Sequence, residues 1–128
     1  MAIKVEKLVK RFGEIVAVNE LSFDVRRGEI CALLGGNGAG KTTTISMLLG
    51  LLIPSTGKIE ILGADMLRDR YRVLSMINFS SPYVDLPKRL TSRENLMVYS
   101  RLYGIRNPKE RVAGLAKDLD IDRLLDRP

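Results

Sequence analysis

The sequence contains one cysteine and no histidine, tryptophan or glutamine. A single cysteine cannot form an internal disulfide, so Cys31 is typical of a reducing compartment, and its place within the apolar segment EICALL predicts a small buried residue. Long apolar runs are also missing. The longest, residues 45–53, is about half the length of a membrane-spanning helix, and the alternating start MAIKVEKLVKRF lacks the apolar core of a signal peptide. These absences predict a cytoplasmic protein.

The composition is that of a folded protein with an excess of basic residues. Hydrophobic residues make up 45% and charged residues 28%, which excludes a disordered chain. Lysine and arginine total 21 against 15 acidic residues, a net charge of +6 that would suit a nucleic acid or an anionic membrane. The basic residues are nevertheless scattered in short pairs such as Lys10-Arg11 and Lys88-Arg89. We therefore expect solvated surface charges and no nucleic acid partner, with contact to a polyanion or a membrane as the alternative.

Hydrophobic periodicity predicts a strand-rich first part. Residues 30–34 are almost uniformly apolar, as expected of a parallel strand covered on both faces. A glycine-rich loop follows them and leads into a predicted helix from Lys41 to Leu51 or Leu52, and a short helix is expected at residues 66–71. Further strands are predicted at residues 3–9, 16–18, 21–25, 58–62 and 73–79.

The last third is predicted to be helical. Prolines and an aspartate between residues 81 and 87 interrupt the pattern and predict a boundary between two domains, 1–80 and 81–128. Thr91 and Glu94 then have the spacing of a capping box, which predicts a helix that ends at Gly104, and Asn107-Pro108 predicts the start of a second helix. The positions expected to pack are Leu96, Tyr99, Leu102 and Tyr103 in the first helix and Val112, Leu115, Ala116 and Leu119 in the second.

The segment GGNGAGKT, residues 35–42, matches the pattern G-x-x-x-x-G-K-[ST]. Glycines let the backbone turn sharply, so that successive N–H groups hold a phosphate chain at the start of a helix. Lys41 supplies a point charge for the β- and γ-phosphates, and the hydroxyl of Thr42 is the expected ligand for Mg²⁺. The loop follows an apolar segment and precedes an apolar helix, which is the context that the pattern requires. We therefore predict a site for nucleotide phosphates and Mg²⁺.

The flanks of this loop carry a more specific resemblance. The segment GGNGAGKTT is preceded by VNELSFDVRRGEICALL and followed by GLLIPSTGKIEILGAD, and the combination resembles the nucleotide-binding domain of ABC transporters over the whole length of the chain. Residues 89–105, RLTSRENLMVYSRLYGI, are similar to the start of that family's helical subdomain, particularly in exporter ATPases that pair with a separate permease. The resemblance implies an α/β fold, with a P-loop NTPase core, an N-terminal antiparallel β portion and the start of a helical subdomain.

The same resemblance implies a function and a set of partners. The chain would be the ATP-binding part of a transport ATPase that couples ATP binding and hydrolysis to substrate movement, with export as the expected direction. It would work as a homodimer or pseudo-homodimer of nucleotide-binding domains, peripheral on the inner face of the cell membrane beneath a permease, with ATP and Mg²⁺ as cofactors. The alternatives are a non-hydrolysing nucleotide-binding module that regulates a partner, a truncated remnant, and, from charge alone, a soluble P-loop ATPase that acts on nucleic acid.

The resemblance also assigns roles to individual residues. Phe12 matches the aromatic residue that stacks on adenine in the family, although an apolar residue that closes a strand is the simpler alternative. The family's phosphate-loop roles fall on Gly35, Asn37, Gly38, Ala39, Gly40, Lys41, Thr42 and Thr43.

The sequence departs from the family's pattern in three respects. Gly36 stands where the family usually has proline, which leaves the empty loop more flexible. Ser81 is the nearest counterpart of the family's metal-contacting glutamine, so it is a candidate Mg²⁺ contact, or else a turn residue that ends a strand. The sequence stops at Pro128, before the family's signature and its strand ending in Asp-Glu, and it has no histidine for the family's switch. The resemblance therefore implies a fragment in which residues 30–34 lack their parallel neighbours, and which binds ATP with little hydrolysis.

Overall fold

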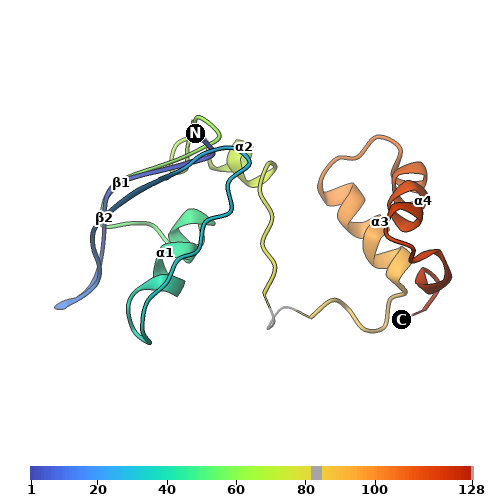
Figure 1. The fold of residues 1–128 in the computed structure, drawn as a ribbon, viewed down its shortest axis with the longest axis horizontal. Coiled ribbons are helices and arrows are strands. Elements are labelled where there is room, and N and C mark those ends of the chain that lie inside the picture. The colour runs from blue at the N-terminus through green and yellow to red at the C-terminus, as the bar shows by residue number, and fades with distance from the viewer. Residues whose placement is uncertain (82–84, 128) are drawn as a thin grey trace. The chain divides into compact units, whose positions relative to one another are not determined.

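The computed structural model describes residues 1–81 and 85–127, and the chain divides into two compact units, Met1–Phe79 and Ser80–Pro128 (Figure 1). The segment expected to separate two domains, residues 81–87, lies partly outside the described residues. Each unit has an apolar core of its own. Across the described residues, every helix is too short or too polar to cross a bilayer.

The first unit is built on a four-stranded antiparallel sheet of strand order β2-β1-β3-β4. β1 (Ile3–Phe12) and β2 (Ile15–Val25) form a long hairpin, and Gly13 allows the turn between them with a φ of 57°. β3 (Thr56–Ile61) pairs with the other edge of β1, and β4 (Ala64–Asp65) pairs with β3. The expected antiparallel portion is confirmed, with one continuous strand over residues 15–25 in place of two short ones.

The core of this unit lies between the sheet and two helices. Val5 and Leu8 of β1 and Ile59 of β3 are almost completely buried. Val5 and Leu8 are three residues apart, and a register shift between them, where Lys7 has a φ of 45°, interrupts the alternation of β1. The helices α1 (Lys41–Leu48) and α2 (Arg70–Leu74) contribute Met47 and Val73 to the same cluster. The phosphate loop is therefore joined to a helix that is packed on the sheet.

α1 ends earlier than the sequence predicted. Gly50 adopts a φ of 65° and donates its N–H to the carbonyl of Met47, and the N–H of Leu51 donates to the carbonyl of Ser46. These two hydrogen bonds make a Schellman motif, in which glycine takes the left-handed conformation at lowest cost. The expected end at Leu51 or Leu52 is therefore wrong by one helical turn.

The strand predicted at residues 73–79 is wrong. Residues 70–74 are helical, and the short helix expected at residues 66–71 begins later than predicted. Val73 is fully buried, and Leu74 and Ile77 pack against the core beside it. Val73 and Leu74 therefore reach the core from the end of α2, and Ile77 reaches it from beyond the last residue of the helix.

The parallel strand predicted at residues 30–34 is also absent from the structure. The segment contains no strand, and no strand among the described residues pairs with it. Ile30 is 102% exposed and Leu34 is 87% exposed, so the apolar run is uncovered. Cys31, expected to be buried, is exposed for the same reason.

The second unit consists of α3 (Ser92–Leu102), α4 (Pro108–Asp118) and the 3₁₀ turn η1 (Asp122–Leu124). Its core is a cluster of Val112, Ala116 and Leu125, against which Leu96, Met97 and Ile121 pack. The expected packing positions are confirmed at Leu96, Val112 and Ala116. They are wrong for four exposed residues, Tyr99, Leu102, Tyr103 and Leu119.

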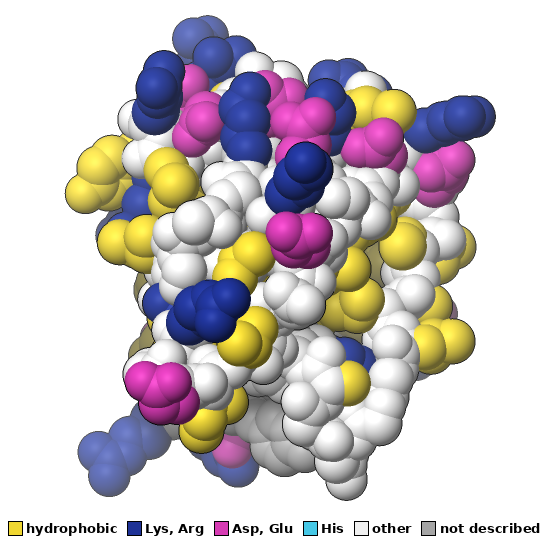
Figure 2. Space-filling view, turned by 90° about the vertical axis from the view of Figure 1, so that its left-hand side faces the viewer, with side chains coloured by type: hydrophobic (Ala, Val, Ile, Leu, Met, Phe, Trp, Pro, Cys, Tyr) yellow, Lys and Arg dark blue, Asp and Glu magenta, His cyan; other side chains and the backbone are white. Residues whose placement is uncertain are grey.

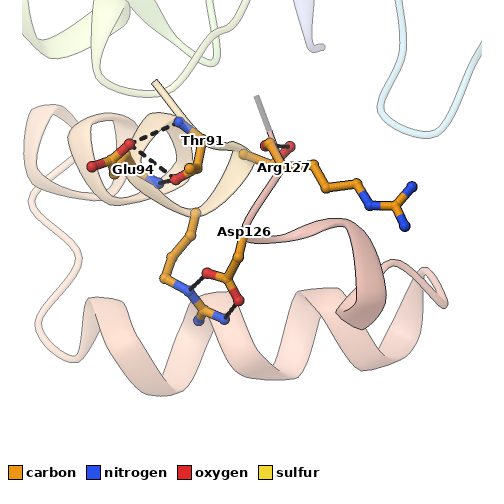
Figure 3. Close-up of polar contacts among 6 residues, drawn as sticks. Thr91, Glu94, Asp126 and Arg127 are labelled. Atoms are coloured by element: carbon orange, nitrogen blue, oxygen red, sulfur yellow. Dashed lines mark hydrogen bonds and ion pairs between the residues drawn. The ribbon is translucent and has the colours of Figure 1, made fainter. Parts of the chain in front are cut away.

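The capping box at the start of α3 is confirmed (Figure 3). The N–H of Glu94 donates to Oγ1 of Thr91 at 3.2 Å, and the N–H of Thr91 donates to Oε2 of Glu94 at 2.7 Å. The backbone N–H and the hydroxyl of Thr91 lower the pKa of the Glu94 carboxyl. Both residues named by the sequence pattern therefore fix the first turn of the helix.

Residues near the end of the described chain are hydrogen-bonded to the same turn of α3. Arg93 donates from Nε and Nη2 to the two carboxylate oxygens of Asp126, at 2.7 and 3.1 Å (Figure 3). The N–H of Arg93 donates to the carbonyl of Leu125 at 2.7 Å. This fork-shaped ion pair raises the pKa of Arg93 and lowers the pKa of Asp126.

Basic and acidic side chains are mixed on the face drawn in Figure 2, where dark blue and magenta alternate along the upper edge. Surface ion pairs in the first unit include Lys4 with Glu6 and Lys58 with Glu60. The net positive charge is therefore not gathered into a basic patch on this face.

Candidate functional site

The glycine-rich loop lies between the exposed segment of residues 30–34 and the first turn of α1 (Figure 1). Gly38 and Gly40 both have a φ of 80°, a conformation that side chains rarely adopt. The N–H of Ala39 donates to the carbonyl of Gly36 at 3.3 Å and closes a turn inside the loop. The two glycines therefore shape the loop in the way that the sequence pattern predicted.

Gly40 is both the N-cap of α1 and the point where the loop meets the sheet. A Cβ atom at Gly40 would overlap the carbonyl oxygen of Ala17 in β2 and would lie 3.1 Å from Cγ2 of Val18. The helix begins at once, since the N–H of Thr44 donates to the carbonyl of Gly40 at 2.8 Å. The start of α1 is thus held against β2 by a contact that only glycine permits.

Lys41 reaches back across the loop. Its Nζ donates to the carbonyl oxygens of Gly35 and Gly36, at 2.6 Å each. Carbonyl oxygens are weaker partners for an ammonium group than phosphate oxygens, because the latter carry a formal charge. The side chain is therefore already placed over the loop, with bonds that a phosphate could replace.

The first turn of α1 offers main-chain donors to an anion. Gly40 has no side chain to cap the helix, and the first turn contains no acidic residue. The first N–H groups of a helix lack partners within the helix, and its dipole favours negative charge at this end. The residues present therefore fit a phosphate group.

The hydroxyl residues of this turn differ in exposure. Thr42 is exposed, Thr43 is half-buried and Thr44 is buried in the core. Of the three, Thr42 is the one whose hydroxyl is open to a metal ion. No cluster of three or more histidine, cysteine, aspartate or glutamate residues occurs within residues 1–81 and 85–127, so Mg²⁺ would depend mainly on phosphate oxygens and water, as it commonly does.

Phe12 lies at the tip of the hairpin that carries Ala17. It pairs with Ile15 next to the Gly13 turn, and the residue is 49% exposed. Ala17 lies two residues beyond Ile15 on β2, so the hairpin brings Phe12 to the strand that contacts Gly40. Ser81 is half-buried and belongs to the second unit.

Two residues that sequence reasoning missed contribute to the site. Ala17 provides the backbone against which Gly40 packs, and no local signal in the sequence identifies that contact. The Nζ of Lys10 lies 5.0 Å from the ring centroid of Phe12. The i, i+2 spacing of Lys10 and Phe12 on one strand could have indicated this second contact, since such residues lie on the same face.

Known proteins resemble this chain in sequence and in fold. The family model described as ABC transporter matches residues 18–128. The "Probable multidrug ABC transporter ATP-binding protein YbhF" of Escherichia coli (strain K12) is 38% identical over 104 residues, 81% of this chain and 18% of that protein. The "Nod factor export ATP-binding protein I" of Ralstonia nicotianae is 36% identical over 98% of this chain and 40% of that protein.

A solved structure described as "ATP binding subunit of ABC transporter" is 28% identical and has a TM-score of 0.85, over 99% of this chain and 54% of that structure's chain. The chain thus spans less than half the length of these two curated relatives. Both the sequence and the fold lead to the same family. The chain belongs to the family of ABC transporter ATP-binding domains.

Proposed function

We propose that residues 35–43 bind the phosphates of ATP, and that the chain serves as the ATP-binding part of a transport ATPase. The observation that carries this proposal is the start of α1, which has no side-chain cap and has Lys41 folded over the loop. An anion at this position gains both unpaired N–H groups and a positive charge. Nucleotide phosphates suit the site because the loop also has the spacing of the P-loop pattern.

Each residue of the site has a proposed role. Lys41 exchanges its two carbonyl partners for β- and γ-phosphate oxygens, and Thr42 holds Mg²⁺ together with phosphate oxygens and water. Phe12 stacks on adenine. Ser81 is a further candidate for a metal contact, to be tested by Ser81→Ala. Main-chain N–H groups of the loop are proposed to hold the phosphates at Gly35, Asn37, Gly38, Ala39, Gly40 and Thr43.

The wider function rests on the relatives. The names of two of them describe multidrug transport and Nod factor export, so we propose an export ATPase that works with a membrane permease. In that assembly the chain would be cytoplasmic, peripheral to the membrane and paired with a second ATP-binding domain. The transported substrate would be selected by the permease.

We further propose that this chain alone hydrolyses ATP slowly. Phosphoryl transfer needs a positioned metal, a positioned water molecule and groups that stabilise the developing charge. The proposed site supplies the metal contact and Lys41, but the first turn of α1 contains no acidic residue that could activate water. Release of phosphate at the rate of a complete transport ATPase would overturn this part of the proposal.

The proposed site is tested by Lys41→Ala. Binding of ATP with Mg²⁺ is measured by calorimetric titration, with Lys109→Ala as a control that removes an equal charge from the second unit. We expect Lys41→Ala to weaken binding by at least about tenfold, since one charge-assisted contact contributes on the order of 1.5–3 kcal/mol. Equal affinities in Lys41→Ala and the unchanged chain would overturn the assignment of the site.

A further inference from the structure

The ring of Phe12 has a cation over one of its faces. The Nζ of Lys10 lies 5.0 Å from the ring centroid, within the distance at which a cation is attracted to an aromatic face. The other contacts of Lys10 hold this ammonium group in place, since Nζ also donates to the carbonyl of Ile53 at 2.8 Å. The cation therefore covers one face of the ring, while Phe12 as a whole is 49% exposed.

The segment that contains Ile53 is itself fastened to β1. The N–H of Ser55 donates to the carbonyl of Val9 at 2.8 Å, and the N–H of Arg11 donates to Oγ of Ser55 at 3.0 Å. With the bond from Lys10, three hydrogen bonds join the residues that follow α1 to the last three residues of β1 before Phe12. The helix that begins at the phosphate loop is thus connected through a short segment to the aromatic ring.

We propose that Lys10 is a positioning residue for the adenine base, which covers one face of Phe12 so that the base stacks on the opposite face. This inference rests on the proposed function, because it takes Phe12 as the residue that stacks on adenine. Lys10 does not touch the nucleotide. It restricts the ring to one orientation and holds the strand end at a fixed distance from the phosphate loop.

The physical argument follows from the exposure of the ring. A half-exposed phenylalanine at a hairpin tip can rotate about its side-chain bonds, and that freedom is lost when a base binds. A cation anchored to a main-chain carbonyl reduces this freedom before binding. Because the base also prefers an offset stack on a ring face, a ring that already presents its free face binds the base at lower entropic cost.

The test separates the base from the phosphates. Dissociation constants of ATP and of inorganic tripolyphosphate, each with Mg²⁺, are measured for the unchanged chain and for Lys10→Met, which keeps the length of the side chain without its charge. We expect Lys10→Met to raise the dissociation constant of ATP by about two- to fivefold, as the energy of an exposed cation–π contact predicts. Tripolyphosphate has no base, so its affinity should not change.

Three further variants act as controls. Lys10→Arg keeps a cation over the ring and should restore the affinity for ATP. Ser55→Ala removes a hydrogen bond from the same segment but leaves the cation in place. The ratio of the affinity for ATP to the affinity for tripolyphosphate should therefore stay the same as in the unchanged chain. In Phe12→Ala there is no ring to orient, and Lys10→Met should then have no additional effect on ATP.

The outcomes distinguish this inference from the proposed function. If the Lys10→Met variant binds ATP as tightly as the unchanged chain, or more tightly, the proposed role of Lys10 is overturned. The lysine would then have no effect on the base, or it would block the ring face on which the base stacks. An equal loss of affinity for ATP and for tripolyphosphate also overturns it, because the substitution would then act on phosphate binding or on the fold. If the unchanged chain binds neither ligand, the proposed function fails, and the role of Lys10 fails with it.

Discussion

Gly40 lies so close to the carbonyl oxygen of Ala17 that a Cβ atom at that position would overlap it. The contact joins the phosphate loop to β2 and leaves no space for a side chain at Gly40, which also has a φ of 80°. Gly38 has the same φ, but a Cβ atom there would have no neighbour within 4 Å. The two glycines therefore serve different purposes, one for conformation alone and one for conformation and close packing.

Gly40→Ala should consequently destabilise the first unit more than Gly38→Ala. A left-handed backbone costs a residue other than glycine about 1–3 kcal/mol, and at Gly40 the overlap with β2 adds to it. We expect Gly38→Ala to lower the midpoint of thermal unfolding by a few degrees and Gly40→Ala by roughly twice as much or more. Circular dichroism against temperature measures both.

Gly36→Ala is the matched control for these two variants. Gly36 has no positive φ, and a Cβ atom there would have open space. Its replacement should leave the unfolding midpoint unchanged or raise it by a few degrees, because alanine adopts this backbone without strain and reduces the conformational entropy of the unfolded chain. Equal midpoints for Gly36→Ala and Gly40→Ala would show that the close contact with Ala17 does not hold the loop.

Local sequence signals were sufficient for the sheet and for the loop. The alternation of residues 58–62 identified a strand, because burial of one face of β3 leaves a period of two in the sequence. Residues 3–9 also form a strand as predicted, although a register shift between Val5 and Leu8 interrupts the period of two in its buried residues. The phosphate loop was recognisable because glycine, lysine and threonine at fixed offsets meet the geometric needs of a loop before a helix. In both cases the cause of the structure is local.

Residues 30–34 could not be placed in the same way. Their apolar character indicates that they need cover, but a strand also requires a partner for its backbone, and that partner is not encoded in the segment itself. Ile30 and Leu34 are exposed because no strand within the described residues pairs with them. An apolar run therefore predicts burial only when its neighbours are known.

The exposure of Cys31 gives a direct test of this segment. We expect a maleimide to modify the native chain at a rate within about tenfold of the rate for the chain unfolded in urea, since accessible thiols are not protected by opening of the fold. Mass spectrometry over time measures both rates, and Cys31→Ser provides the unreactive blank. Protection by several hundredfold or more would show that residues 30–34 are packed in solution.

Polar burial explains another difference between sequence and structure. Asn95 is buried in α3, although its polarity predicts exposure, because its Nδ2 donates to the carbonyls of Pro87, Leu90 and Thr91. Leu102 is 74% exposed in the same helix. The hydrogen bonds of Asn95 join residues before the helix to its first turns, and a hydrophobic pattern cannot predict them.

Asp65 should make the stability of the first unit depend on acid pH. Its Oδ1 accepts the N–H groups of Arg68 and Leu67, and these bonds lower the pKa of the carboxyl. A folded pKa below the unfolded one means that the carboxylate stabilises the fold above about pH 4, the ordinary range of aspartate, and that this contribution is lost as the pH falls through the lowered folded pKa. We expect the free energy of unfolding to decrease over that acid window.

Asp65→Asn keeps an oxygen that can accept both N–H groups but removes the titration. The variant should be less stable than the unchanged chain at pH 7, and the difference should shrink towards pH 3 as the carboxylate is protonated. Urea unfolding followed by circular dichroism at several pH values measures this. A difference that is constant from pH 7 to pH 3 would contradict the role of the charge.

The start of α3 provides a prediction for the second unit. Thr91→Ala removes the oxygen that accepts the N–H of Glu94, so the first turn of α3 loses its cap. Loss of an N-cap costs about 1 kcal/mol, which corresponds to roughly fivefold faster amide exchange where that unit opens as a whole. Thr91→Ser keeps the hydroxyl and should exchange at the original rate. Because the two units have separate cores, amides of β1 and β3 should be unaffected, and a similar acceleration there would mean that the two units unfold together.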